Sequence, residues 1–202
     1  MKKKISVHSS TKSKERASKL RIISGEWRSR QLPIPNIEGL RPTPDRVRET
    51  LFNWINYEVP GARCADLFCG SGALGLEALS RGAKSALFVD NSKIVAKQMT
   101  DNLTTLKAEN YQVIQQNAAE FLATATPQPL DLIFLDPPFR KNWLAQIIPL
   151  LENGWLADKA LVYIEMEKEA ALPELPPAWH LEKEKTAGQL VYRLFAVNQI
   201  TA

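Results

Sequence analysis

Two short stretches of the sequence combine residue types that could bind a cofactor and position an amino group. The first runs from Asp66 to Gly75 and is rich in glycine, and the second is Asp136-Pro137-Pro138-Phe139. Glycines at a turn let the backbone approach a ligand without strain at Cβ, and the helix expected behind them offers unpaired N–H groups. In the second stretch, the Asp136 carboxylate and the Pro137 carbonyl could accept the two hydrogens of an amine within a stiff proline corner.

Ligand-binding residue types follow four consecutive strands of the expected sheet. These residues are Gly70 and Gly72, then Asp90, Asn117 and Asp136. In open α/β sheets, ligands bind beyond the carboxyl ends of the strands, where the strand order reverses. Side-chain packing alone does not explain why four consecutive strands end on such residues. We therefore expect one ligand-binding site at this edge of the sheet.

The glycine loop by itself fits more than one nucleotide cofactor. The run Gly70-Ser71-Gly72-Ala73-Leu74-Gly75, with Asp90 twenty residues after Gly70, matches the dinucleotide pattern. A phosphate-binding P-loop is excluded because no Gly-Lys-Ser/Thr follows. Asp66, directly before the loop, favours a cationic ligand over a pyrophosphate, and the Asp136 corner has no role in hydride transfer. S-adenosylmethionine suits both features because it carries a sulfonium and an ammonium and has no phosphate.

Strands and helices alternate along the chain from position 63 onward. Strands are expected at 63–68, 85–89, 111–115, 130–135 and 161–165, with helices at 73–81, 93–106, 118–124 and 143–151 between them. Segments 181–185 and 190–197 indicate a C-terminal antiparallel hairpin, and 20–24 with 27–32 indicate a small N-terminal hairpin. Thr43 is the expected N-cap of a helix that starts at Pro44 and ends near Asn56. This order predicts an α/β fold, a mostly parallel sheet with helices on both faces.

The N-terminal quarter of the chain is basic. Residues 1–48 contain thirteen Lys or Arg and four Asp or Glu, a net charge of +9, whereas the whole chain has a net charge of +4. A basic arm on an acidic body is typical of a nucleic-acid binder, although a solvated disordered tail has the same composition. Candidate nucleic-acid-binding residues are Arg21, Trp27, Arg28, Arg30, Arg41 and Arg48. Trp27 could stack on a base or pack the hairpin onto the domain.

The length and composition of the chain limit its number of domains, its location and its partners. The 202 residues suit one domain of ordinary size, with a disordered basic tail at 1–18, a basic hairpin and linker at 19–44, and the main domain at 45–202. No apolar run reaches membrane-spanning length, and the Lys-rich start is not followed by the apolar stretch of a secretory signal. The spacing of Cys64 and Cys69 fits neither a zinc site nor a disulfide framework. We therefore expect a cytoplasmic protein without metal or membrane partner, and a monomer.

The motifs resemble those of a known enzyme class. Asp66-x-Phe68-x-Gly70-x-Gly72 resembles the first motif of the Rossmann-like S-adenosylmethionine-dependent methyltransferases, and Asp136-Pro137-Pro138-Phe139 resembles the (Asp/Asn)-Pro-Pro-(Tyr/Phe) motif of those that methylate exocyclic amines. With the block from Arg41 to Asn53, the chain is most similar to the bacterial enzymes that methylate the 2-amino group of a guanine in small-subunit (16S) ribosomal RNA. The resemblance implies that fold and that activity, with the small-subunit RNA or particle as partner.

The resemblance also implies roles for individual residues. Gly70, Ser71 and Gly72 would wrap the methionine part of the cofactor, Asp90 would bind the ribose, and Asn91 would lie beside the adenine. The implied cofactor site also contains Asp66, Phe68, Asn117 and Ala118. Asn117 departs from the family pattern, which often has Asp there, but an amide oxygen can also accept from the adenine amine. Asp136, Pro137 and Phe139 would form the catalytic corner, with Phe139 stacked on the target base.

Two other functions fit the same residues. The proline corner also serves methyltransferases that act on DNA adenine or on protein glutamine. Alternatively, the chain could be a non-catalytic RNA-binding assembly factor that retains a cofactor fold.

Overall fold

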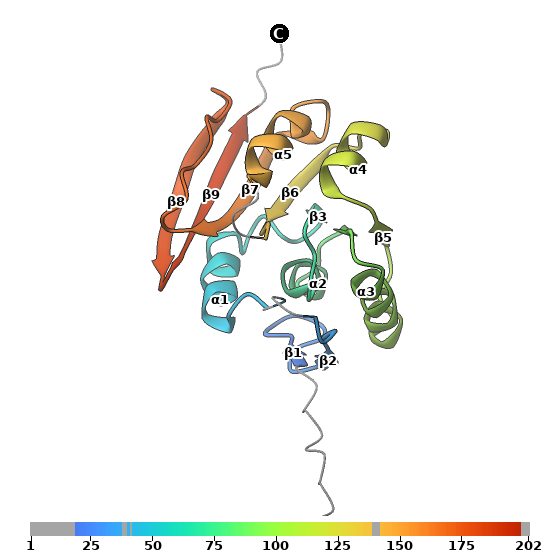
Figure 1. Cartoon of the computed structure of the whole chain (residues 1–202). Coiled ribbons are helices and arrows are strands. Elements are labelled where there is room, and N and C mark those ends of the chain that lie inside the picture. Colours follow the sequence, from blue (N-terminus) through green and yellow to red (C-terminus); the bar gives the residue numbers. More distant parts are fainter. Residues whose placement is uncertain (1–18, 38–39, 41, 139–141, 199–202) are drawn as a thin grey trace, which may run out of the picture.

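The computed structural model describes residues 19–37, 40, 42–138 and 142–198, which form a seven-stranded sheet, five helices and a separate two-stranded hairpin (Figure 1). The strands are β1 (Lys19–Arg21), β2 (Gln31–Pro33), β3 (Arg63–Asp66), β4 (Ser85–Asp90), β5 (Tyr111–Gln115), β6 (Leu130–Leu135), β7 (Leu156–Glu167), β8 (Trp179–Ala187) and β9 (Leu190–Asn198). The helices are α1 (Asp45–Trp54), α2 (Ala73–Ser80), α3 (Lys93–Leu106), α4 (Ala118–Thr124) and α5 (Trp143–Leu151). No helix among these residues is long and apolar enough to cross a membrane.

The large sheet has the strand order β5-β4-β3-β6-β7-β9-β8. Strands β3 to β7 pair in parallel, and β9 runs antiparallel to both β7 and β8. The chain moves outward from β3 to β5 and then returns to place β6 on the other side of β3. The strand order therefore reverses between β3 and β6, which is where ligands bind in open α/β sheets.

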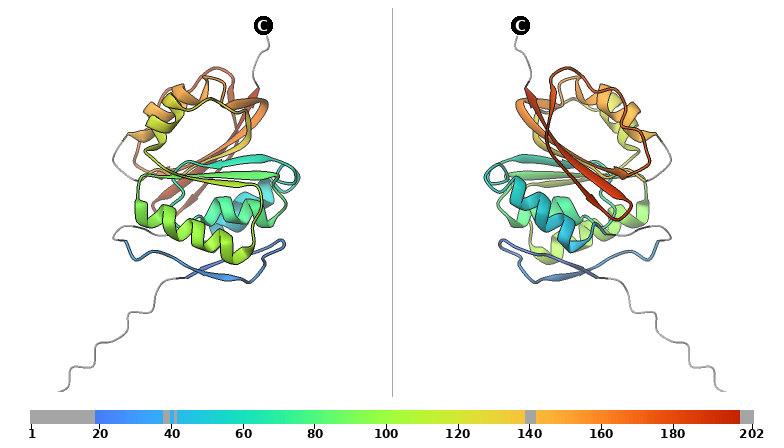
Figure 2. Two further views of the ribbon diagram at one scale, coloured as in Figure 1. Left: turned by 90° about the vertical axis from the view of Figure 1, so that its right-hand side faces the viewer. Right: turned by 90° about the vertical axis from the view of Figure 1, so that its left-hand side faces the viewer.

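Helices cover both faces of the sheet (Figure 2). Side chains of α1, α2 and α3 share one apolar cluster with residues of one face, and side chains of α4 and α5 share a second cluster with residues of the other. Because successive strand residues point to opposite faces, Phe134 belongs to the first cluster and Ile133 to the second. The expected α/β fold, mostly parallel with a C-terminal hairpin and a small N-terminal hairpin, is confirmed.

The N-terminal hairpin packs beneath α2 and α3 (Figure 2). Its apolar side chains are buried in the same cluster as those two helices: Leu20, Ile22, Trp27, Leu32 and Ile34. Backbone N–H groups of the hairpin also donate to the buried Glu77 of α2, from Ile23 and Ser24 at 2.9 Å each. Hairpin and α/β layers thus share one core.

Several expected element bounds differ from the structure. The hairpin strands cover only Lys19–Arg21 and Gln31–Pro33 rather than 20–24 and 27–32, and β3 ends at Asp66 rather than at position 68. The N-cap of α1 is Pro44 rather than Thr43, and it makes no side-chain cap bond because proline has no polar side-chain atom. Helix α1 ends at Trp54 rather than near Asn56. Strand β7 begins at Leu156 rather than at position 161, because Leu156 pairs with Leu130 of β6 and Lys159 pairs with Asn198 of β9. This stretch has no continuous apolar pattern. The Ser92 cap of α3 is confirmed, and its side chain accepts from the Val95 N–H at 3.4 Å.

Candidate active site

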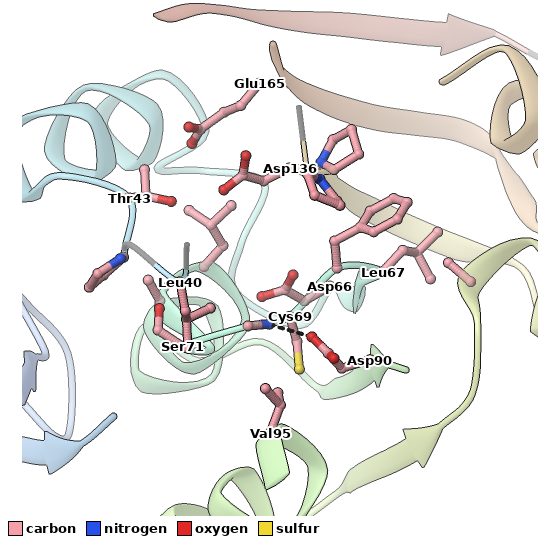
Figure 3. Close-up of a pocket in the computed structure, with 18 of the residues that line it drawn as sticks. Leu40, Thr43, Asp66, Leu67, Cys69, Ser71, Asp90, Val95, Asp136 and Glu165 are labelled. Carbon is pink, nitrogen blue, oxygen red and sulfur yellow. Dashed lines mark hydrogen bonds between the residues drawn. The ribbon is translucent and has the colours of Figure 1, made fainter. Parts of the chain in front are cut away.

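A cavity of about 880 Å³ opens beyond the carboxyl ends of β3 to β7, at the reversal of strand order (Figure 3). Ten residues predicted from the sequence line it: Asp66, Phe68, Gly70, Ser71, Asp90, Asn91, Asn117, Ala118, Asp136 and Pro137. These residues therefore lie together around one cavity at this edge of the sheet. The residues over β3, β4 and β5 form one half of the cavity, and those over β6, β7 and the β8–β9 turn form the other.

Asp90 at the end of β4 organises the glycine loop. Its Oδ2 accepts the Gly70 N–H at 3.0 Å, and its Oδ1 accepts the Ser92 N–H at 2.8 Å (Figure 3). Gly70 has a φ of 48°, which glycine adopts without Cβ strain. A carboxylate has about four lone-pair sites, so Asp90 retains acceptor capacity toward the cavity after making both bonds.

Asp66 forms a hydrogen bond with the helix that follows the loop. Its Oδ2 accepts the Gly75 N–H of α2 at 3.0 Å, and the residue is only 2% exposed. Burial, with the like charges of Asp136 and Asp90 nearby, raises the pKa of Asp66 to about 7. A cation in the cavity would favour the ionised form of this carboxyl.

Gly72, which was predicted to contact the cofactor, lies at the point where the glycine loop joins α2. It is the N-cap of α2 with a φ of 75°, and a Cβ there would lie 2.2 Å from Cε of Met99 on α3. Gly72 is absent from the cavity lining. The left-handed backbone favours glycine at this position, and its neighbours Ser71 and Ala73 both line the cavity.

Asn117 is the N-cap of α4. Its Oδ1 accepts the N–H groups of Ala119 at 2.9 Å and Glu120 at 3.3 Å. The expectation that this oxygen accepts from an adenine amine is therefore not supported, since the helix cap already uses it. The side-chain NH₂ remains as a donor.

The other half of the cavity holds a second pair of carboxyl groups, Asp136 after β6 and Glu165 on β7 (Figure 3). Thr43 also lines this half of the cavity, and the Tyr163 hydroxyl donates to Oε1 of Glu165 at 2.8 Å. Burial raises the pKa of Asp136 to about 6. Burial and the neighbouring Asp136 raise the pKa of Glu165 well above its usual range.

Sequence reasoning missed Glu165 and Thr43 as parts of the cavity lining. Glu165 follows the apolar run 161–164 at the end of a strand, so the strand-end rule that found Asp90 and Asp136 could have found it too. Thr43 lies in the segment before α1, and no local pattern shows that this segment crosses the open edge of the sheet.

The described residues of the cavity wall include acidic side chains but no basic ones. Four carboxylic acids line it, namely Asp66, Asp90, Asp136 and Glu165, and no Lys, Arg or His occurs among the described residues of the lining. Such a wall repels a pyrophosphate and attracts a cation.

Trp143 also lines the cavity, and its ring lies 5.9 Å from that of Phe68. Its buried Nε1 has no hydrogen-bond partner within the described part of the chain.

The candidate nucleic-acid-binding residues divide into two groups. Arg21, Arg28 and Arg30 are exposed on the hairpin, although Arg21 pairs with Asp45 at 2.9 Å. Arg48 and Trp27 are buried, so Arg48 is not available to a phosphate, and Trp27 takes the second of its two expected roles by packing the hairpin onto the domain. Arg48 is 1% exposed and donates to Asp45 and to the Arg21 carbonyl, and Trp27 is 8% exposed within the core.

Two predicted residues lie outside the described part of the chain. These are Arg41, a nucleic-acid candidate, and Phe139, the predicted stacking ring.

Comparison with known proteins identifies the family. The family model described as conserved hypothetical protein 95 matches residues 20–196. Over 180 residues the chain is 53% identical to ribosomal RNA small subunit methyltransferase D of Escherichia coli K12, covering 89% of this chain and 90% of that protein. The protein of the same name from Haemophilus influenzae is 51% identical, covering 87% of this chain and 93% of that protein.

The chain belongs to this family. A solved structure supports the assignment, because yhhF from Escherichia coli aligns with a TM-score of 0.82 at 51% identity, covering 90% of this chain and 99% of that one. The chain is therefore a methyltransferase, as predicted from the glycine loop and the proline corner. The family model matches the N-terminal hairpin as well as the sheet, since the matched residues begin at position 20.

Proposed function

We propose that the chain transfers the methyl group of S-adenosylmethionine to the exocyclic 2-amino group of a guanine in small-subunit ribosomal RNA. The observation that carries the cofactor assignment is the cavity wall with four carboxylic acids and no described basic residue. A nicotinamide dinucleotide would place a pyrophosphate against this wall, whereas S-adenosylmethionine places a sulfonium and an ammonium there. The names of the relatives support the RNA substrate.

The residues of the β3–β5 half fit this cofactor. Asp90 retains acceptor capacity for the ribose hydroxyls, and Asp66 presents a buried carboxyl for a cationic group. Gly70 keeps its part of the cavity wall free of a side chain. A Cβ at this position would lie 2.9 Å from Cδ1 of Leu40, which also lines the cavity. Asn117 and Ala118, at the start of α4, would hold the adenine through the Asn117 NH₂ and the Ala118 N–H.

The residues of the other half suit an exocyclic amine. Such an amine is a poor nucleophile because its lone pair is delocalised into the ring, so it must be held with that lone pair toward the methyl carbon. Asp136 and the Pro137 carbonyl would accept its two hydrogens, and the proline pair keeps both acceptors in place. Positioning of this kind contributes up to roughly 7–11 kcal/mol in well-aligned intramolecular reactions. The cofactor supplies an electrophilic methyl group with a neutral thioether as leaving group.

The target base must leave its stack to enter the cavity, at a cost of a few kcal/mol. We propose that Phe139 offsets part of that cost by stacking on the base, worth about 1–3 kcal/mol. The exposed Arg28 and Arg30 of the hairpin would contact RNA phosphates, together with Arg21 and Arg41. We further propose that the protein works as a cytoplasmic monomer and uses no metal.

Methyl transfer from labelled S-adenosylmethionine tests the proposal directly. The acceptors are ribosomal RNA and small-subunit particles from cells that lack the enzyme, with DNA and protein as parallel acceptors. We expect label in small-subunit RNA, released by digestion as N2-methylguanosine and identified by mass spectrometry. Label in DNA adenine or protein glutamine would instead support the other amine methyltransferases. Failure to bind S-adenosylmethionine by calorimetry would support a non-catalytic factor.

A further inference from the structure

Glu165 of β7 is a buried acid beside the acceptor proposed for the target amine. It is 2% exposed and lines the same cavity as Asp136 (Figure 3). The parallel register pairs Leu135 of β6 with Ile164 of β7, so the residue that follows each of them is one of the two acids. Because paired residues of neighbouring strands point to the same face of a sheet, the two side chains reach the cavity from adjacent positions.

Glu165 has few partners for a buried carboxylate. The Tyr163 hydroxyl donates to its Oε1 at 2.8 Å, and none of the ion pairs between described residues includes it. By contrast, the buried Glu77 accepts from two backbone N–H groups and from Arg48 and Arg81. A buried acid without a cation is costly unless hydrogen-bond donors satisfy it. After the tyrosine bond, Glu165 still has acceptor capacity for the donors of a ligand in the cavity.

Guanine presents two kinds of donor side by side. Its ring N1–H lies next to its 2-amino group, whereas adenine has an unprotonated N1 next to its 6-amino group. Enzymes that flip a base out of its stack recognise it by hydrogen bonds to this edge. A carboxylate is an acceptor only, so it can bind the N1–H of guanine but repels the N1 lone pair of adenine.

We propose that Glu165 selects guanine by accepting the ring N1–H while Asp136 accepts the neighbouring hydrogen of the 2-amino group. The inference rests on the proposed methylation of guanine and assigns a residue that recognises the base. Two acids at neighbouring strand ends match two donors at neighbouring positions of one base. Tyr163 is a positioning residue, because its bond to Oε1 fixes the orientation of the carboxylate.

The base and the cofactor together offset the charge of the two acids. In the free protein, two adjacent buried carboxylates repel each other, which favours protonation of one of them. Hydrogen bonds to the charged form favour ionisation, and a guanine edge brings N–H donors to both Glu165 and Asp136. The sulfonium of S-adenosylmethionine adds a positive charge to the same cavity. An adenine in this position would instead place a lone pair against Glu165 and leave its charge uncompensated.

A base analogue at the target position separates the ring N1–H from the amino group. 2-Aminopurine keeps the 2-amino group but has an unprotonated N1, and ligation of a synthetic segment can place it at the mapped position of small-subunit RNA. We expect the wild-type enzyme to prefer guanine by at least about 100-fold in kcat/KM, since a site built to bind an N–H rejects the analogue that lacks it. Equal methylation of the two bases would overturn the proposal.

Variants of Glu165 should change this preference. In Glu165→Gln, the amide can turn its oxygen toward an N1–H or its NH₂ toward an unprotonated N1, so we expect the preference for guanine to fall to about tenfold or less. Glu165→Leu has no acceptor and should lower kcat/KM for guanine at least about tenfold, with the Kd of S-adenosylmethionine within about threefold. An unchanged preference in Glu165→Gln would show that another group recognises N1.

Two further variants serve as controls. Tyr163→Phe removes the bond that orients the carboxylate and should lower kcat/KM for guanine about three- to tenfold, with the preference for guanine retained. Glu169→Gln changes an exposed acid just after β7 in the same way as Glu165→Gln and should leave both the rate and the preference unchanged. Loss of the preference in Glu169→Gln would contradict the assignment to Glu165.

One measurement needs no RNA. Guanosine and adenosine monophosphates are titrated at millimolar concentration into the protein saturated with S-adenosylhomocysteine, and the carboxyl carbon resonances of Glu are followed by NMR. We expect guanosine monophosphate to shift the Glu165 resonance and to bind at least about tenfold more tightly than adenosine monophosphate, with the difference lost in Glu165→Leu. Equal binding of the two nucleotides by the wild type would overturn the proposal. If guanosine monophosphate is selected but ribosomal RNA receives no methyl group, only the proposed RNA substrate is wrong.

Discussion

The Glu77 carboxylate of α2 accepts the backbone N–H of Ile23 at 2.9 Å, across 54 positions of sequence. The same carboxylate accepts from Ser24, from Arg81 at 2.8 Å and from the buried Arg48 at 3.5 Å. A basic hairpin that could have been a loose arm is thereby fixed to the helix that follows the glycine loop.

Removing this carboxylate should destabilise the whole fold. Glu77→Ala removes one of the two carboxylate partners of the buried Arg48, leaving Asp45, and deprives two hairpin N–H groups of their acceptors. Breaking a buried ion pair costs about 3–5 kcal/mol. Urea denaturation measures the free energy of unfolding. The exposed Glu49 of α1 provides the control, and Glu49→Ala should change stability by less than about 0.5 kcal/mol. Equal effects of the two variants would show that the hairpin is not held through Glu77.

Gly25 tests how closely the hairpin approaches α2. It has a φ of 80°, and a Cβ there would lie 1.8 Å from the Ser80 carbonyl oxygen. Gly82 has a φ of 92° but nothing within 4 Å of a Cβ. Gly82→Ala should therefore cost only the left-handed backbone strain, about 1–2 kcal/mol, whereas Gly25→Ala should cost an additional 1–3 kcal/mol of overpacking. Thermal unfolding of the pair measures the difference, and equal shifts would contradict the close contact.

Asp90 should control cofactor affinity. Asp90→Asn replaces one of the oxygens that accept the Gly70 and Ser92 N–H groups, and hydrogen bonds to charged groups contribute about 1.5–3 kcal/mol each. We expect the Kd of S-adenosylmethionine, measured by calorimetry, to rise roughly 10- to 100-fold. Asp158→Asn, at an exposed position of β7, is the control and should leave the Kd unchanged. An unaltered Kd in Asp90→Asn would mean that the loop keeps its shape without this anchor.

Protonation of Asp136 should lower the rate of methyl transfer at acidic pH. Its pKa is raised to about 6 by burial, so the acceptor is ionised above that pH and protonated below it. We expect kcat under saturating cofactor to fall as pH decreases through about 6. Asp136→Asn should lose most turnover at every pH while still binding S-adenosylmethionine. Loss of cofactor binding in this variant would indicate a disturbed fold instead.

The basic N-terminus should determine the salt dependence of RNA binding. Residues 1–18 contain six Lys or Arg and one Glu, and the logarithm of affinity falls with that of salt in proportion to the phosphates neutralised. A variant lacking residues 1–18 should bind RNA with a flatter salt dependence and unchanged stability. Deleting residues 1–33 should instead unfold the protein, because Leu20, Ile22 and Trp27 belong to the core. An identical salt slope in the shorter deletion would exclude the tail from the RNA interface.

Local patterns in the sequence determined much of the site. The glycine loop, the helix caps and the end of each apolar strand depend on residues a few positions apart, and these placed Gly70, Asp90 and Asp136 correctly at one edge. The proline corner and the acid before the loop also pointed to a cationic cofactor without any knowledge of the strand order. Such features follow from the sequence because neighbouring residues impose them.

Tertiary structure alone decided which polar groups remain available. Arg48 looks like a phosphate ligand until Glu77, 29 positions away, buries it in an ion pair, and Asn117 uses its oxygen on its own helix. Glu165 becomes part of the site only because β7 pairs beside β6 and the segment before α1 brings Thr43 over both strand ends. For Arg48 and Glu165 the physical reason is the same: solvation and hydrogen-bond partners are set by contacts between distant segments, which residue type and spacing do not specify. Asn117 differs, because its cap bonds join residues two and three positions apart.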